Sequence, residues 1–310
     1  MKIAHVSDVH IRNHRYHEEY TAVFEELYEK LRELKPDLIV NTGDTAHTKL
    51  QLSPAYFHMT AKFFENLADI APLHVILGNH DLNLRNPGRI DAITPIVEAL
   101  DHKDIHFHKF SKEVDLGNGF VLNVLSIVDE DKWIDPTDES KVNIAMFHGS
   151  VAGVTTDTGW IMEHGDINIQ QFKPFDYVLL GDIHKTYQKL DPQGRVAYPG
   201  SLVQQNFGES MDKGFLLWDI KDKENFTCEH HPLTNPKPFV TIELTPKGKM
   251  PKNVEVTPGA RVRLVSQNNL PLDIMRRAID IAKGRFKPES VTFLNRSSGE
   301  RGSVQDLTDG

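Results

Sequence analysis

The chain has 310 residues, of which 35 are Lys or Arg, 44 are Asp or Glu, 16 are His and one is Cys, giving a formal net charge of −9. A hydrophobic content of 39% excludes a disordered chain, and no apolar run reaches the ~18 residues needed to span a membrane, so we expect no membrane association. The single Cys228 excludes an internal disulfide and a thiolate zinc finger, and together with an N-terminus unlike a signal peptide it favours a cytoplasmic protein.

Apolar periodicity in the first third of the chain predicts alternating strands and helices. We expect helices over residues 19–34 and 55–67, which separate strands over residues 3–6, 37–40 and 74–77. This alternation indicates an α/β fold with parallel strands. Open α/β sheets bind their ligands at the carboxyl ends of the strands, so polar residues at those positions become candidates for a site.

Shorter apolar runs follow beyond residue 105. We assign them to a second sheet packed on the first, with strands over residues 121–127, 142–147, 177–180, 214–220 and 227–231. The last part of the chain predicts a smaller α+β unit, with a helix over residues 272–282 and strands over residues 240–244, 261–265 and 291–294.

A proline-rich stretch between these two parts predicts a domain boundary. We expect a first domain over residues 1–232, a linker over 233–239, a capping domain over 240–296 and a flexible tail over 297–310. Residues 235–310 contain 13 Lys or Arg and 8 Asp or Glu, a net charge of +5, which leaves 22 against 36, or −14, for residues 1–234. The negative total therefore does not exclude a basic module that contacts nucleic acid.

Five short polar segments each follow a predicted strand. They are Asp8-Val9-His10, Gly43-Asp44, Gly78-Asn79-His80-Asp81, His148-Gly149 and Gly181-Asp182-Ile183-His184. Taken singly, each is a weak signal, because a histidine at a strand end is more often structural than a ligand. Five in succession, with carboxylates, imidazoles and an amide, indicate a site for Mn²⁺, Fe²⁺ or Zn²⁺ rather than Mg²⁺.

These segments resemble the signature D-x-H…G-D…G-N-H-D…H…G-H-x-H of the calcineurin-like metallophosphoesterases. A further stretch resembles the nuclease subunit of the SbcC/SbcD-type double-strand-break repair complexes: Tyr198-Pro199-Gly200-Ser201, Asn206-Phe207-Gly208-Glu209 and Lys213-Gly214-Phe215. The resemblance covers residues 1 to about 220. It implies a four-layer metallophosphoesterase sandwich, in which two packed mixed sheets are flanked by helices, with a small α+β capping domain.

The resemblance also implies roles for individual residues. Two divalent metal ions, Mn²⁺ first and Mg²⁺ second, would be bound by Asp8, His10, Asp44, Asn79, His148, Asp182 and His184, with Asp44 bridging the two. His80 would act at the leaving oxygen, with Asp81 orienting it. His47 and His17 match positions that steer the substrate, although His17 lies among neighbouring histidines that are equally consistent with a solvent-exposed surface.

Asp182 departs from the signature, which has histidine at this position. A carboxylate can replace the imidazole as a ligand and makes the second site harder, which favours Mn²⁺ or Mg²⁺. The alternative is a weakened second site and a degraded enzyme.

The basic residues of the capping domain are candidates for phosphate contacts. Arg261 and Arg263 alternate on a predicted strand and so share a face. The remaining candidates are Arg276, Arg277, Lys283, Arg285 and Lys287. Such contacts give affinity without sequence specificity, although exposed basic residues are commonly only solvated. We expect the tryptophans Trp133, Trp160 and Trp218 to lie in the core or an interface.

The predicted function is that of a two-metal DNA nuclease, a 3′→5′ exonuclease and single-strand or hairpin endonuclease that acts on double-strand ends. The sequence has no G-x-x-x-x-G-K-[ST] motif, so the resemblance implies a separate SbcC-type ATPase as partner, as well as a homodimer. Two alternatives remain open: a phosphoesterase acting on small phosphodiesters or phosphoproteins, and an inactive phosphoesterase fold that serves as a scaffold.

Overall fold

The computed structural model describes residues 1–86 and 88–296, so the expected tail over 297–310 lies outside the described residues. The chain divides into two compact units, of which the first is Met1–Asn235 and the second begins at Pro236. Within the described ranges, no helix combines the length and the apolar character that crossing a bilayer requires.

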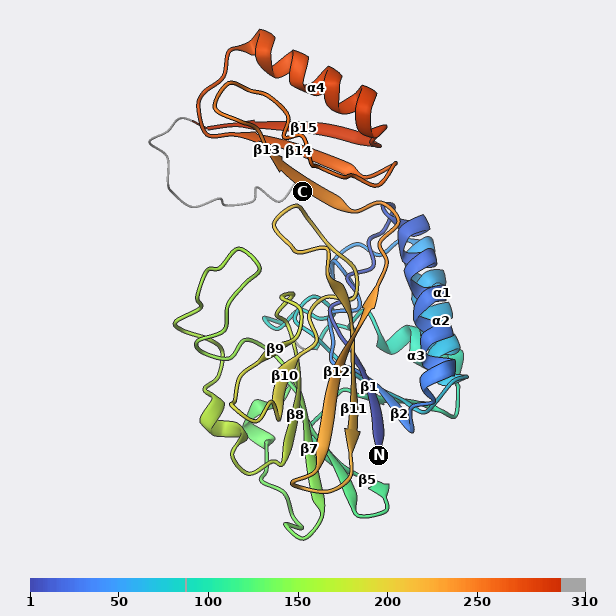
Figure 1. Cartoon of the computed structure of the whole chain (residues 1–310). Helices are drawn as coiled ribbons and strands as arrows, with labels where there is room; N and C mark the ends of the chain where they lie inside the picture. Colours follow the sequence, from blue (N-terminus) through green and yellow to red (C-terminus); the bar gives the residue numbers. More distant parts are fainter. Residues whose placement is uncertain (87, 297–310) are drawn as a thin grey trace. The chain divides into compact units, whose positions relative to one another are not determined.

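The first unit contains two six-stranded sheets (Figure 1). In the first sheet, four parallel strands lie in chain order: β1 (Lys2–Val6), β2 (Leu38–Asn41), β3 (Leu73–Ile76) and β4 (Ile105–His108). The sheet continues beyond β1 with two antiparallel strands, β11 (Lys213–Ile220) and β12 (Phe226–Leu233). The assignment of residues 214–220 and 227–231 to the second sheet was therefore wrong, because β11 pairs along β1 instead.

The second sheet has the order β5-β6-β7-β8-β10-β9. Its strands are β5 (Lys112–Gly117), β6 (Phe120–Leu125), β7 (Val142–His148), β8 (Tyr177–Gly181), β9 (Gln188–Lys189) and β10 (Val196–Tyr198). Strands β6, β7, β8 and β10 are parallel, whereas β5 and β9 are antiparallel to their neighbours. The fold class is thus confirmed as mixed α/β with two large mixed sheets and a third small one.

Three helices cover the outer face of the first sheet: α1 (His17–Leu34), α2 (Pro54–Ala68) and α3 (Thr94–Leu100). Helix α2 begins after Ser53, whose side chain accepts a hydrogen bond from the amide of Tyr56, and α1 ends at Lys35 in the left-handed conformation. Over the second sheet, the expected helix layer consists of loops and two 3₁₀ helices, Glu130–Lys132 and Ile169–Phe172.

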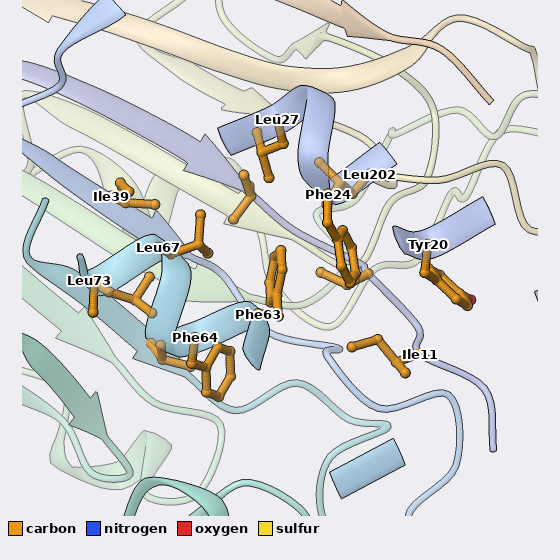
Figure 2. Packing of buried hydrophobic residues seen from close by; sticks show 14 of the residues in the cluster. Ile11, Tyr20, Phe24, Leu27, Ile39, Phe63, Phe64, Leu67, Leu73 and Leu202 are labelled. Atoms are coloured by element: carbon orange, nitrogen blue, oxygen red, sulfur yellow. The ribbon is translucent and has the colours of Figure 1, made fainter. Parts of the chain in front are cut away.

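Figure 2 shows how the helices pack on the first sheet. Aromatic rings from the two long helices meet there, and the centroids of Phe24 and Phe63 lie 4.3 Å apart. Ile39 and Leu73 of the sheet belong to the same buried cluster and lie near Leu67 of α2 in Figure 2. Between the two sheets, a second apolar cluster includes Trp218, which is fully buried, whereas Trp160 is 60% exposed, which leaves an interface position as the remaining part of its prediction.

The second unit is a three-stranded parallel sheet with one helix. Its strands are β13 (Phe239–Glu243), β14 (Arg261–Ser266) and β15 (Ser290–Asn295), in that order. Helix α4 (Leu272–Phe286) connects β14 to β15 and buries Ala278, Ala282 and Phe286 against the sheet.

Two buried histidines of the first unit predict a loss of stability in acid. His74 Nδ1 lies 2.9 Å from His108 Nε2. Burial and neighbouring positive charges lower the pKa of His74 to about 4 and that of His108 to about 3. Below pH 6.5 these two histidines therefore bind more protons in the unfolded chain than in the folded chain. Their contribution to the free energy of unfolding should fall by up to about 1.4 kcal/mol per pH unit for each histidine between pH 6.5 and about 4.

Urea unfolding at pH 7.5, 6.0 and 5.0 in the presence of EDTA measures this slope. The variant His108→Gln should show a shallower slope than the wild type over the same range. Equal slopes for the two proteins would contradict the prediction, because acid sensitivity would then arise from other groups.

Candidate metal centre

The five predicted segments meet where the carboxyl ends of strands from both sheets come together. Asp8, Asp44 and Asn79 follow β1, β2 and β3 of the first sheet, while His148 and Asp182 lie at the ends of β7 and β8 of the second. A hydrogen bond joins the two sets, because His148 Nδ1 lies 2.7 Å from the carbonyl oxygen of Thr42. Segments distant in sequence thus supply one polar cluster.

The first group of candidate ligands is Asp8, His10 and His184, whose ligand atoms all lie within 4.8 Å of one another. His10 Nε2 is 2.9 Å from His184 Nε2, and His184 Nε2 is 3.7 Å from Asp8 Oδ1. Asp8 and His10 are almost fully buried. Two imidazoles and a carboxylate facing one another are a ligand set for a borderline divalent cation.

The second group is Asp8, Asp44 and His148, which meets the same distance criterion. Asp44 belongs to the second group and also approaches the first: its Oδ1 is 3.4 Å from His148 Nε2 and its Oδ2 is 3.5 Å from His10 Nε2. Asp182 adjoins the second group: its Oδ1 lies 3.7 Å from His148 Nε2 and accepts a hydrogen bond from the side-chain Nδ2 of Asn79 at 3.3 Å. Burial raises the pKa of Asp182 to about 6.

Several polar atoms of the cluster are buried without a hydrogen-bond partner among the described residues, including Asp8 Oδ1, Asn79 Oδ1 and His148 Nε2. Native proteins rarely leave such atoms unpaired, and a metal ion is one way of satisfying them. The protonation of the His148 ring is consistent with metal binding. A carbonyl only accepts, so the neutral ring donates from Nδ1 to Thr42 and keeps its lone pair on Nε2. The residues present therefore fit two divalent cations.

The backbone at the ligands is held in the left-handed region, where side chains other than glycine are uncommon. The φ angles are 51° at Asp8, 51° at His10, 53° at Asp44 and 104° at Asp182. Such strain persists only where the surroundings enforce it, and it clusters at functional sites. At these four residues the positive φ turns the backbone sharply after the preceding strand.

His80 lies at the exposed edge of the cluster. Its backbone amide donates to Asp44 Oδ1 at 2.8 Å, and its ring lies 4.9 Å from the His10 ring between centroids. Its Nδ1 is 2.9 Å from the carbonyl oxygen of His47 and therefore donates to it. His47 itself is half-buried, and burial and nearby Arg12 lower its pKa to about 4.

Asp81 does not orient the His80 ring as expected. Its buried carboxylate instead accepts hydrogen bonds from the backbone amides of Ala46 at 2.7 Å and Gly78 at 2.9 Å. Burial and the nearby charge of Asp44 raise its pKa to about 7. Asp81 thus ties together the two loops that carry Asp44 and His80, and the His47 carbonyl contacts the ring.

His17 lies outside the two candidate ligand groups above and outside the third such group of the described residues, which is His10, Asp44 and His80. It is the first residue of α1, and its Nε2 is 2.7 Å from the carbonyl oxygen of Arg12. The structure thus gives it a contact within the loop after β1.

A family model for calcineurin-like phosphoesterases matches residues 1–186, which is more than half of the chain. The chain belongs to this family. The calcineurin-like phosphoesterases are metal-dependent, in agreement with the ligand cluster at the strand ends, all of whose candidate ligands, from Asp8 to His184, lie within the matched residues.

Among curated relatives, protein R555 of Acanthamoeba polyphaga mimivirus is 34% identical over 281 residues, which cover 86% of this chain and 20% of that protein. The DNA double-strand break repair protein Mre11 of Methanopyrus kandleri is 25% identical over 247 residues, covering 70% of this chain and 53% of Mre11. The chain thus spans about a fifth of the length of R555 and about half of the length of Mre11. Among solved structures, the Pseudomonas putida nuclease MPE is 21% identical, covering 45% of this chain and 57% of that one, with a TM-score of 0.26.

Two residues of the stretch from Tyr198, the last residue of β10, to Phe215 in β11 have roles that the sequence of this phosphoesterase did not reveal. The Tyr198 hydroxyl donates to the carbonyl of Gly149 at 2.7 Å and accepts from the amide of Val151 at 3.0 Å, so it fixes the loop after His148. Lys213, which could have been a solvated charge, has a side chain only 2% exposed. The motif-like spacing of this stretch was the available signal.

The basic residues proposed for phosphate contacts in the second unit differ in burial and in their partners. Arg261 is buried, donates to the carbonyl of Lys237 at 2.9 Å and pairs with Glu289 at 3.0 Å. Arg263 is half-buried on the same strand. Arg285 is exposed but donates to backbone carbonyls of the loop before β14, those of Pro251, Lys252 and Val254. The other basic candidates are exposed on or next to α4: Arg276, Arg277, Lys283 and Lys287.

Proposed function

We propose that the chain is a two-metal DNA nuclease that uses Mn²⁺, or Mg²⁺ in its place. The observation that carries this proposal is the position of Asp44, within 3.5 Å of a histidine of each candidate ligand group. Asp8, His10 and His184 would hold one cation, Asn79, His148 and Asp182 the other, and Asp44 both. When bound, the cations supply charge neutralisation at the scissile phosphate and activation of water.

His80 would contribute proton transfer. It is exposed beside Asp44, and its ring orientation is fixed because Nδ1 donates to the His47 carbonyl. Because Nδ1 keeps its proton, Nε2 would give a proton to the leaving oxygen from the imidazolium form, and the ring would return to the neutral form with its proton on Nδ1. His47, whose ring centroid is 6.2 Å from that of His80, would lie beside the same substrate phosphate group.

Support for DNA as the substrate comes from outside the metal centre. The stretch from Tyr198 to Phe215 resembles the SbcD-type nucleases, and one relative, from Methanopyrus kandleri, is named a DNA double-strand break repair protein. The exposed basic residues of α4 are suited to phosphate contacts. From the same resemblance we propose 3′→5′ exonuclease and single-strand or hairpin endonuclease activity, a homodimer and an SbcC-type ATPase partner.

The test is cleavage of labelled linear duplex and hairpin DNA with Mn²⁺, beside a small phosphodiester and a phosphomonoester. We expect DNA to be cut, with loss of activity in EDTA and recovery with Mn²⁺. Hydrolysis of only the small substrates would replace the nuclease proposal with a general phosphoesterase. Failure on every substrate with any divalent metal would favour the inactive scaffold.

The basic residues of α4 give a separate prediction. The double variant Arg276→Ala with Arg277→Ala should bind linear DNA more weakly, and the slope of log affinity against log salt should become shallower by roughly 1–2, since each lost phosphate contact removes about 0.9. Fluorescence anisotropy with labelled DNA at several salt concentrations measures both quantities. Lys103→Ala, at a side chain 88% exposed in the first unit, is the matched control. An unchanged slope in the double variant would exclude these two arginines from the DNA contact.

A further inference from the structure

The carboxylate of Glu209 collects an unusual number of hydrogen-bond donors. Its side chain is 6% exposed. His184 Nδ1 lies 2.8 Å and Asn206 Nδ2 3.2 Å from Oε1. The donors to the other oxygen, Oε2, are Ser201 Oγ at 3.1 Å, the backbone N–H of Gln205 at 3.0 Å and Lys213 Nζ at 3.3 Å. Almost every lone-pair direction of this carboxylate therefore has a partner, which fixes its position.

The contact with His184 determines how that ring is protonated. A carboxylate with this many donors acts only as an acceptor, so His184 must donate from Nδ1. The lone pair of the neutral ring is then on Nε2, the atom that lies 2.9 Å from His10 Nε2 and 3.7 Å from Asp8 Oδ1. Glu209 thus selects the tautomer in which His184 can serve as a metal ligand.

Lys213 holds the same histidine by its backbone. Its buried ammonium group donates to the carbonyl of His184 at 2.7 Å and pairs with Asp157 at 3.1 Å as well as with Glu209. The ring and the main chain of His184 are therefore fixed by two adjoining side chains from one segment, residues 209–213.

The other candidate ligand, His148, is supported differently. Its Nδ1 donates to a backbone carbonyl, that of Thr42, at 2.7 Å. No side-chain substitution at Thr42 removes that acceptor, whereas the acceptor for His184 is a side chain. The two ligand groups therefore differ in whether their orienting contact can be deleted by mutation.

We propose that Glu209 and Lys213 are positioning residues that hold His184 with Nε2 toward Asp8 and His10, and that they support one of the two metal ions selectively. The proposal rests on the metal-binding part of the proposed function, and it is independent of whether DNA is the substrate. It gives a structural role to Ser201, Asn206 and Glu209, which entered the argument only as parts of a sequence motif.

The decisive experiment compares the wild type, Glu209→Gln and the control Glu163→Gln, an exposed glutamate. Free Mn²⁺ is followed by electron paramagnetic resonance as it is titrated into metal-free protein. We expect Glu209→Gln to weaken one of two Mn²⁺ ions by about 10–100-fold and to leave the other within about threefold, as for other residues that orient a ligand. Glu163→Gln should bind both ions as the wild type does.

A second readout needs no metal. The hydrogen bond and charge of Glu209 outweigh burial and raise the pKa of His184 to about 9. Long-range ¹H–¹⁵N spectra of the metal-free protein are therefore recorded above pH 10, where the ring is neutral. They report which ring nitrogen carries the proton, and the variant His184→Gln identifies the His184 signals. We expect the Nδ1–H tautomer in the wild type and a mixture in Glu209→Gln. If Glu209→Gln fails to fold, Glu209→Asp keeps the charge near Lys213 but shortens the side chain, and it should show the same mixture.

The outcomes separate this proposal from the nuclease assignment. An unchanged His184 tautomer, or equal weakening of both Mn²⁺ ions, overturns the positioning role even if DNA is cleaved. A changed tautomer with selective loss of one ion supports it even if the wild type cleaves no DNA.

Discussion

Asp44→Asn is expected to lower phosphodiester hydrolysis by about a thousandfold or more. Asp44 belongs to the second candidate ligand group and also approaches the first, with its two oxygens 3.4 and 3.5 Å from His148 and His10. The amide keeps the shape of the side chain but removes its negative charge and one of its two acceptor oxygens. Metal stabilisation of the reacting phosphate contributes several kcal/mol, and each ~1.4 kcal/mol corresponds to a tenfold change in rate, so losing about 4 kcal/mol gives the expected factor.

The measurement is the initial rate on a small phosphodiester and on labelled DNA, at Mn²⁺ concentrations that saturate the wild type. Asp131→Asn is the matched control, since Asp131 is exposed and the same charge is removed. Unfolding curves for both variants verify that they fold. An Asp44→Asn rate within tenfold of the wild type would show that Asp44 does not bridge the two groups.

The candidate metal site could be predicted from the sequence because each of its segments is local. A short apolar strand followed at once by Asp, His or Asn can be read within a few residues, as at Asp8 and at His148. Parallel strands place their carboxyl ends together, so local patterns were sufficient to predict convergence. The same reasoning placed most of the strands and the two long helices within a few residues of their observed bounds.

Pairing between strands could not be predicted in this way. Strand β11 lies beside β1 although more than 200 residues separate them in the chain. Strands β4 and β5 alternate apolar and polar residues, but each contains only two large apolar side chains, beside two histidines in one and three charged residues in the other, and such short runs give a weak signal. Edge strands need fewer apolar residues than central ones, and β4 and β5 are both edges of their sheets.

Side-chain roles were the least predictable part of the site. Asp81 follows His80 directly, yet its carboxylate turns to backbone amides of two loops. Arg261 stands in a basic stretch, yet Glu289, 28 positions later, pairs with it. Both outcomes depend on partners that only the folded chain brings near. A charged residue that is buried must find such partners, and the sequence does not reveal which residues will be buried.

The glycines at the strand ends lead to the second large expected effect. The sequence assigned them to sharp turns, and Gly43, with a φ of 97°, agrees with that role. Gly78 does not have a positive φ. A glycine is required there because atoms of Asp44 and His148 lie close to the position that a Cβ would occupy. A Cβ added there would overlap the backbone nitrogen and Oδ1 of Asp44 and lie 2.7 Å from His148 Cε1. Space for the two ligands therefore depends on a missing side chain.

Gly78→Ala should consequently disrupt both ligand groups, since the displaced Asp44 lies close to a histidine of each group. We expect activity on the small phosphodiester to fall by at least about a hundredfold, which corresponds to about 2.7 kcal/mol, and the free energy of unfolding to fall by about 1–3 kcal/mol, as in other overpacked sites. Gly88→Ala is the control, because its added Cβ would meet no heavy atom closer than 3.6 Å. Rates, Mn²⁺ titrations and urea unfolding of the two variants test this, and a fully active Gly78→Ala would mean that the loops after β2 and β3 can separate without loss of the metal centre.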